Sequence, residues 1–476
     1  MPALERRRGK GHEEDGEDEE DGEDGEDGED GEDREDGALM RTIMFGSMLV
    51  WLATTPYAQE PIRLTLEEAL ARGLQASHRL AELDARRVAA DAAGDARGAG
   101  DRPIVSLQGG YTRTNHVTPF IVPGVAGQLP RVLYPDVPDN LRSRIDLQWP
   151  IYSGGRTDAL ERAARAEASA LGQDRLTAEA DLRLEITRAF WSIVTAQATV
   201  RVLEDSVASV ESHLTDVRNR LSVGLVPPND VLSTEAQRSR EQVLLIEARN
   251  QLEASRTELR RLIDVSPDAP IDIAAPLDPP PAAGAAFESL VGQARTDRSE
   301  RRALDNRIQS AREREAAVAA GRLPMMAVTG GYDYARPNPR IFPRVDEWQS
   351  SWDLGVSVNW TLWDGDRIKG ELAEAVAERR AVQERLLDFD TTLTSEVRQR
   401  RLDLESALAA IPAAEDGVRS ATEARRVVGE RFTAGVATNT EVLDAQLALL
   451  QAELDRTRAI ASARLASARL DRAVGR

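Results

Sequence analysis

Two carboxylate side chains near the C-terminus are the residues best placed to act on a charged solute. Glu441 and Asp444 are three positions apart at the predicted start of a helix, so their side chains share one face. Asp230 holds the position that corresponds to Glu441 in an earlier part of the chain. Carboxylates grouped in this way attract cations. The structural alternative is that acidic residues stabilise a helix N-terminus, by about 0.3–1 kcal/mol each.

Other chemistry finds little support in the sequence. The chain contains no cysteine, which excludes disulfides and thiolate metal sites. Its four histidines are far apart and lack the spacing of zinc ligands. The sequence shows no nucleophile–base pair and no phosphate-binding loop, and its acidic Gly-Glu-Asp repeats lack the spacing of a calcium loop. We therefore expect no enzyme activity, no cofactor and no metal site.

The acidic charge is concentrated at the N-terminus. The 476 residues carry a formal net charge of −20, and residues 1–39 alone hold 19 acidic and 5 basic side chains. This low-complexity segment is predicted to be disordered or not translated. Residues 40–58 have the layout of a signal peptide, with the start codon and cleavage site left open. The remaining chain is only mildly acidic, which disfavours nucleic acid as a partner.

The rest of the chain is an internal duplication. Residues 145–156, IDLQWPIYSGGR, align without a gap on residues 356–367, VSVNWTLWDGDR, at an offset of 211. The same offset relates the segment starting at Arg220 to the segment starting at Arg431. A proline-rich stretch, residues 265–284, reads as a linker. We assign residues 59–280 to a first repeat and residues 281–476 to a second.

Each repeat is predicted to contain two strands whose residues alternate between apolar and polar. The clearest strand alternates Trp352, Leu354, Val356 and Val358 with smaller or polar residues. Such a sheet is compatible with a layer of a soluble sandwich. It is equally compatible with a membrane barrel that faces lipid outside and water inside.

The helices favour the membrane interpretation. Residues 156–221 contain no proline and repeat apolar residues at spacings of three and four, which predicts a helix roughly 100 Å long. Shorter helices are expected at about 64–101, 230–264, 285–321 and 441–474. At the turns after the long helices, left-handed Gly224 and Gly435 would end one helix, and Asn229 or Thr440 would cap the next.

Four strands are too few to close a barrel, because the smallest membrane barrels need about eight. An open sheet in lipid would leave unpaired backbone groups at its edges, which the hydrocarbon region does not tolerate. If the strands lie in a membrane, several identical chains must share one barrel.

With these features, the chain resembles the TolC family of outer-membrane efflux and secretion ducts over nearly all of residues 60–475. The two strand motifs above carry the resemblance, together with the turn motifs RLSVGLVPPNDVL and RFTAGVATNTEVLDAQ. The resemblance implies an α+β membrane protein: a homotrimer whose twelve-stranded outer-membrane β-barrel continues into a long periplasmic α-helical barrel. It also implies a passive channel, opened at its periplasmic tip by a periplasmic adaptor and an inner-membrane pump or secretion transporter.

The resemblance assigns roles to both turns. The adaptor-docking residues would be Val223, Gly224, Leu225, Ala434, Gly435 and Val436. Asp230, Glu441 and Asp444 would form a ring of carboxylates at the constricted entrance. Some family members have a basic residue at the position of Ala437, which forms charge pairs that hold the tip closed. Ala437 cannot form them, so the sequence does not identify the gating contacts of this chain.

A soluble periplasmic adaptor or coiled-coil scaffold is the alternative function. Adaptors have one helical hairpin, whereas this sequence predicts two, and membrane fractionation would separate the two possibilities. The sequence does not identify the cargo, which could be a drug, a metal, a metabolite or a protein.

Overall fold

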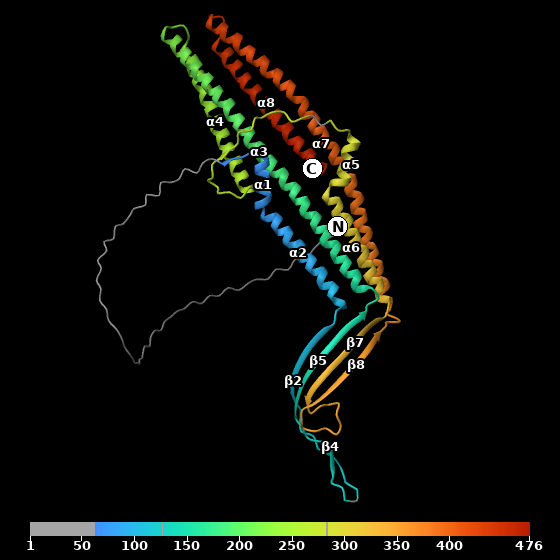
Figure 1. Ribbon diagram of the computed structural model, residues 1–476. Coiled ribbons are helices and arrows are strands. Elements are labelled where there is room, and N and C mark those ends of the chain that lie inside the picture. The colour runs from blue at the N-terminus through green and yellow to red at the C-terminus, as the bar shows by residue number, and fades with distance from the viewer. Residues whose placement is uncertain (1–61, 126, 282–283) are drawn as a thin grey trace, which may run out of the picture. The chain divides into compact units, whose positions relative to one another are not determined.

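The computed structural model describes residues 62–125, 127–281 and 284–476 (Figure 1). All of these residues belong to one compact unit, Gln59–Arg476. The acidic segment 1–39 and the predicted signal peptide 40–58 lie outside the described residues.

Two helices of 67 residues each form the framework of this unit. They are α3 (Arg156–Ser222) and α7 (Arg367–Thr433), and each corresponds to about 100 Å of helix. Each long helix turns back into a helix of 35 residues, α4 (Pro228–Leu262) after α3 and α8 (Asn439–Ala473) after α7. The predicted long helix, its duplicate and both helical hairpins are therefore confirmed.

The predicted single helices at 64–101 and 285–321 are wrong, because each is broken near its start. The first consists of α1 (Leu66–Ala76) and α2 (His78–Gly98), followed by the short 3-10 turn η1 (Ala99–Asp101). Ser77 between them has extended backbone angles, and its hydroxyl accepts a hydrogen bond from the Leu80 N–H at 3.3 Å. Ser77 therefore ends one helix and caps the next.

The second break lies at Arg298, between α5 (Phe287–Asp297) and α6 (Ser299–Ala319), which is followed by η2 (Ala320–Arg322). Arg298 also has extended backbone angles. Its buried guanidinium donates to Glu396 Oε2 and to the Ala473 carbonyl, both at 3.1 Å. These bonds tie the break to α7 and α8.

Four antiparallel strands form one sheet in the order β2-β5-β7-β8. The strands are β2 (Ile104–Arg113), β5 (Asp139–Tyr152), β7 (Met325–Arg336) and β8 (Gln349–Asn359). Each repeat contributes two neighbouring strands, and the repeats meet where β5 pairs with β7. A small hairpin of β3 (Phe120–Val122) and β4 (Arg131–Tyr134) extends the connection between β2 and β5.

The sheet has one apolar face and one polar face, as the predicted alternation requires. One row across the apolar face runs Leu107, Ile145, Tyr332 and Trp352. The next row on the opposite face includes Arg144 and Asp333. Apolar side chains on β8 are strongly exposed in the single chain: 72% for Trp352, 67% for Leu354 and 64% for Val356.

The helical core repeats with the same offset as the sequence. Small clusters of buried side chains lie along α3 and α4 and again along α7 and α8. Four pairs of buried residues match at an offset of 211: Leu182 and Leu393, Ile186 and Val397, Ile193 and Leu404, Leu259 and Leu470. The duplication therefore extends to the positions that stabilise the helices by burial.

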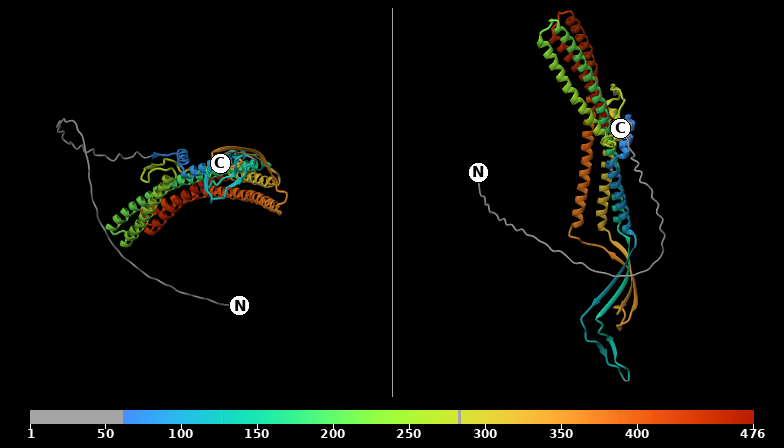
Figure 2. Two further views of the ribbon diagram at one scale, coloured as in Figure 1. Left: turned by 90° about the horizontal axis from the view of Figure 1, so that it is seen from below. Right: turned by 90° about the vertical axis from the view of Figure 1, so that its left-hand side faces the viewer.

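The two helical hairpins lie side by side through α3 and α8, and α6 lies along both long helices (Figure 1). The sheet leaves the helices at one end, and the turns between α3 and α4 and between α7 and α8 lie at the other (Figure 2). Within the described residues, none of the helices contains an apolar stretch long enough to cross a bilayer.

The proline-rich linker between the repeats is partly a strand. Its β6 (Ile271–Asp272) pairs in parallel with β1 (Ile62–Arg63), and Ile271 and Ile273 are buried against Leu259. The linker therefore packs on the first repeat.

Candidate functional site

The two turns at the ends of the long helices have the same backbone geometry. Gly224 and Gly435 have φ values of +75° and +77°, which confirms their predicted left-handed conformation. In the first turn, Gly224 N–H donates to Leu221 O and Leu225 N–H to Arg220 O, both at 2.9 Å. The second turn repeats both bonds 211 residues later. This pair of bonds is the Schellman motif, which uses a left-handed glycine to satisfy the last carbonyls of a helix.

All six residues predicted to dock an adaptor are exposed on these turns. Val223, Leu225 and Val436 expose 67%, 71% and 64% of their surface, although they are apolar. The turns also contact each other, because Arg220 Nη1 donates to the Phe432 carbonyl at 3.2 Å and its guanidinium lies over the Phe432 ring. The two turns that carry the six residues are therefore in contact at the end of the molecule opposite the sheet.

The predicted helix caps at Asn229 and Thr440 are wrong. Thr438 caps α8, since its hydroxyl accepts from the Glu441 N–H at 3.3 Å while Glu441 Oε1 accepts from the Thr438 N–H at 3.2 Å. This reciprocal pair is a capping box. In the first repeat α4 starts after Pro227, with Pro228 as its first residue. Proline suits this position, because its missing N–H would have no partner inside the helix.

The three predicted carboxylates have different environments. Glu441 is held in the capping box, and its Oε2 lies 3.9 Å from Arg431 Nη1. Stabilisation of the helix N-terminus therefore accounts for part of its role. Asp444 is exposed and forms no ion pair with a described residue. Asp230 is half-buried, and its backbone carbonyl accepts from Asn439 Nδ2 at 3.1 Å. Asp444 is therefore the carboxylate most available to a solute.

A buried polar network between the two hairpins was missed in the sequence. Asn439 Nδ2 donates to the Asp230 carbonyl, so Asn439 Oδ1 must accept, and His213 Nε2 donates to it at 2.8 Å. Thr234 and Ser233 hydroxyls complete the shell at 3.2 and 3.1 Å from Asn439 Nδ2. One side chain of α8 thus bonds to both α3 and α4.

The position of His213 lowers its pKa. Burial is the main cause, because it disfavours the charged imidazolium. The hydrogen bond to Asn439 and the charge of Asp216 act in the opposite direction. The His213 ring also packs edge-on against Phe432, with the ring centres 5.2 Å apart. A sequence signal existed: at an offset of 211, Asn439 corresponds to Pro228, which cannot make these bonds.

Ala437 contributes to an apolar cluster beneath the same turns. It packs with Val226 and Val231 around the buried residues Val217, Phe432 and Val442. Among the described residues, no group of three or more histidine or acidic side chains could hold a metal ion.

Comparison with known proteins identifies the family. The model of the outer membrane efflux protein family matches residues 69–264 and 290–476. The outer membrane protein TolC of Vibrio cholerae is 24% identical over 319 residues, which cover 66% of this chain and 72% of that protein.

Solved structures share the fold. The outer membrane protein VceC of Vibrio cholerae aligns with a TM-score of 0.71 at 18% identity, covering 86% of this chain and 96% of VceC. The outer membrane channel MtrE of Neisseria gonorrhoeae, in its open state, aligns with a TM-score of 0.70 at 17% identity. The alignment covers 86% of this chain and 88% of MtrE.

The family match spans both repeats, and the relatives named above are outer-membrane proteins. The α+β fold, the outer-membrane location and the transport class of these proteins agree with the expectations from the sequence. The chain therefore belongs to the outer membrane efflux protein family and is an outer-membrane protein.

Proposed function

We propose that the protein is the passive exit duct of a tripartite efflux or type I secretion system. It works as a homotrimer, whose barrel crosses the outer membrane and whose helices form a tunnel through the periplasm. The observation that carries this proposal is the open four-stranded sheet, apolar on one face and polar on the other.

The need to close the sheet supports the trimer. In lipid, the free edges of β2 and β8 would leave backbone N–H and C=O groups without partners. Pairing β8 of one chain with β2 of the next satisfies both edges. Three chains then give twelve strands, enough for a closed barrel. The apolar row that contains Leu107 and Trp352 would face lipid, and the row that contains Arg144 and Asp333 would face the lumen.

The two turns form the closed entrance in this proposal. Residues 59–280 and 281–476 act as equivalent repeats, each giving two strands and one hairpin to the duct. Val223, Gly224, Leu225, Ala434, Gly435 and Val436 dock the adaptor, which opens the entrance and connects the duct to an inner-membrane pump. Asp230, Glu441 and Asp444 surround the axis, with Asp444 contributing most because it is exposed.

Membrane fractionation and planar-bilayer recording test the duct. We expect the protein in the outer membrane, as a detergent-stable trimer that forms channels. A protein that remains in the soluble periplasmic fraction as a monomer would support the adaptor or scaffold instead.

The entrance is tested by the double variant Glu441→Gln, Asp444→Asn. We expect weaker cation preference and weaker block by divalent cations, since the ring loses its charge. Asp455→Asn, which removes an exposed carboxylate farther along α8, is the matched control. Unchanged selectivity in the double variant would remove both residues from the pore lining.

Adaptor docking is tested by Leu225→Glu with Val436→Glu. We expect intact trimers and channels but loss of adaptor co-purification, because buried carboxylates would oppose an apolar contact. Gln128→Glu, exposed at the sheet end of the chain, controls for the added charge. Normal co-purification of the double variant would place the docking surface elsewhere.

A further inference from the structure

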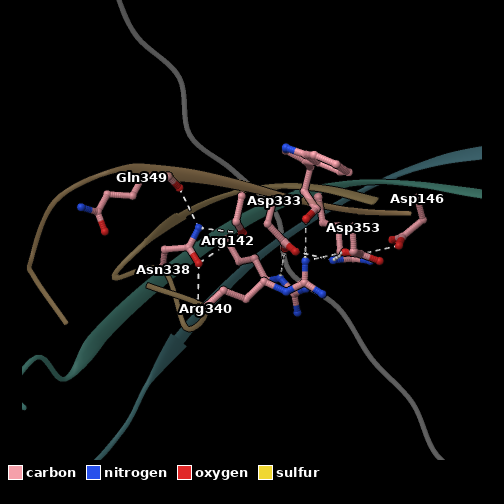
Figure 3. A network of polar contacts seen from close by, with 10 residues as sticks. Arg142, Asp146, Asp333, Asn338, Arg340, Gln349 and Asp353 are labelled. Atoms are coloured by element: carbon pink, nitrogen blue, oxygen red, sulfur yellow. Dashed lines mark hydrogen bonds and ion pairs between the residues drawn. The ribbon is translucent and has the colours of Figure 1, made fainter. Parts of the chain in front are cut away.

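A cluster of charged side chains covers the polar face of the sheet. Arg142 Nε donates to Asp333 Oδ1 at 2.5 Å, and Arg144 binds the other oxygen of the same carboxylate. The Asp333 side chain is only 3% exposed, whereas 52% of the Arg142 side chain is exposed. The buried carboxylate therefore fixes both guanidinium groups, of which that of Arg142 is exposed and that of Arg144 is largely buried (Figure 3).

Arg144 needs the glycine on the neighbouring strand. A Cβ atom at Gly331 would lie 2.2 Å from Arg144 Nη2, so the guanidinium occupies the space above this glycine. From there Arg144 reaches Asp146 Oδ1 at 2.6 Å and Asp353 Oδ1 at 3.2 Å. Its position is thus fixed from three strands.

The segment between β7 and β8 folds onto the same face. Asn338 Nδ2 donates to the Gln349 carbonyl at 2.9 Å, and Arg340 Nη1 lies 2.9 Å from Asp353 Oδ1 (Figure 3). Asn338 is buried. This segment forms a wall beside the arginine cluster.

A cavity of about 270 Å³ lies between this wall, β2 and β5. Three arginines line it, Arg142, Arg144 and Arg344, together with neutral side chains such as Gln108, Thr112 and Asn140. None of the described residues that line it is acidic. At Gly110 an added Cβ would meet no heavy atom of the described residues within 4 Å, so part of the cavity wall is open.

Arg344 brings a positive charge that no carboxylate balances among the contacts of the described residues. Its Nη1 donates to the Tyr134 hydroxyl at 2.8 Å, and its guanidinium lies over the Tyr134 ring. By contrast, Arg142, Arg144 and Arg340 are matched by Asp146, Asp333 and Asp353. The cavity therefore combines preorganised guanidinium donors with one excess positive charge.

We infer that this cavity binds an oxyanion, a phosphate or carboxylate group carried by a small solute. Guanidinium groups suit such ligands, because their planar forks donate to two oxygens at once. The polar face lines the lumen only if the proposed function is correct, so the passage of this solute through the protein rests on that proposal. The binding of the solute in the cavity does not depend on it.

The test uses inorganic phosphate and the full-length protein in detergent, at constant ionic strength. We expect saturable binding in titration calorimetry, weakened at least about threefold by Arg344→Gln. Arg344→Lys keeps the charge and should retain more affinity than the Gln variant. Arg131→Gln, which removes an exposed arginine from β4 outside the cavity, should bind as the parent protein does.

A second variant addresses the cavity itself. Gly110→Asp places a carboxylate in the open part of the wall and should abolish phosphate binding, while Gly110→Ser should not. Absence of saturable binding to the parent protein overturns the inference, and so does an equal loss in Arg344→Gln and Arg131→Gln.

Bilayer recordings separate the two proposals. If phosphate binds but the protein forms no channel, the duct fails and the binding site stands. If channels form and phosphate neither binds nor reduces their conductance, the duct stands and the site fails.

Discussion

The two turns share a backbone and differ in their polar groups. Both end a long helix with a left-handed glycine and the same two hydrogen bonds. The first then starts its next helix with Pro227 and Pro228, whereas the second uses Thr438 and Asn439. Asn439 of the second turn bonds to both helices of the other hairpin, whereas Pro228, at the matching position of the first turn, has no side-chain group that could form such bonds.

This difference separates the features that both repeats need in order to fold from a feature that only one repeat has. Glycine is required in both turns, because the left-handed backbone disfavours residues with a Cβ atom. The buried apolar pairs along the helices are also matched in both repeats. The polar network has a single copy, so it serves the contact between the hairpins and not the hairpins themselves.

The largest expected effects come from the matched core. Ile193→Ala and Leu404→Ala should each lower the free energy of unfolding by about 2–5 kcal/mol, because both leave a cavity at a buried position. Denaturant unfolding of the detergent-solubilised protein measures this. Leu402→Ala, at an exposed position on α7, is the control. A loss in one repeat only would contradict the equivalence of the two cores.

The single-copy network comes next. Asn439→Leu should lower the free energy of unfolding by about 2–3 kcal/mol, since it leaves His213 Nε2 without its buried acceptor and removes one donor to the Asp230 carbonyl. Pro228→Ala, at the matching position of the first repeat, should cost less than about 1 kcal/mol. Equal costs would mean that the two turns do not differ energetically.

The capping box should have a smaller effect. Thr438→Ala should reduce the stability of α8 by about 1 kcal/mol, with early hydrogen exchange confined to the start of that helix. Thr440→Ala is the control, because Thr440 lies within the helix beyond the cap. A larger effect from the control would restore the cap predicted from the sequence.

The smallest effect is a pH dependence. The pKa of His213 is lower in the folded protein than in the unfolded chain, so the unfolded chain binds a proton first as pH falls. The contribution of His213 to stability is therefore complete above its unfolded pKa of about 6.5 and declines below it. Hydrogen exchange at the turns, measured between pH 5 and 7.5, should show this loss of stability at low pH, and His213→Gln should remove the pH dependence.

The sequence predicted the architecture well because its signals were periodic and repeated. The offset of 211, the alternation around Trp352 and the long run without proline each depend on many residues. The breaks at Ser77 and Arg298 were missed because one residue decides each of them, by a single cap or a long-range ion pair.

The candidate site was predicted only in part for the same reason. Exposure of the six turn residues follows from the turn itself, and the left-handed glycines were identified from residue type. The bonds of Asn439 depend on contacts between α8, α3 and α4, which local sequence does not encode. The arginine cavity needs the register of the three strands that line it, β2, β5 and β7, and Arg344 joins it from a loop.

The short pairing of β1 with β6 sets an order of events during folding. Ile62 can pair with Ile271 only after the whole of α1 through α4 has been made, because these helices lie between the two strands in the sequence. Until then the backbone N–H and C=O groups of β1 have no strand to pair with. Formation of this two-stranded sheet therefore requires the complete first helical hairpin, and it joins the start of the first repeat to the linker.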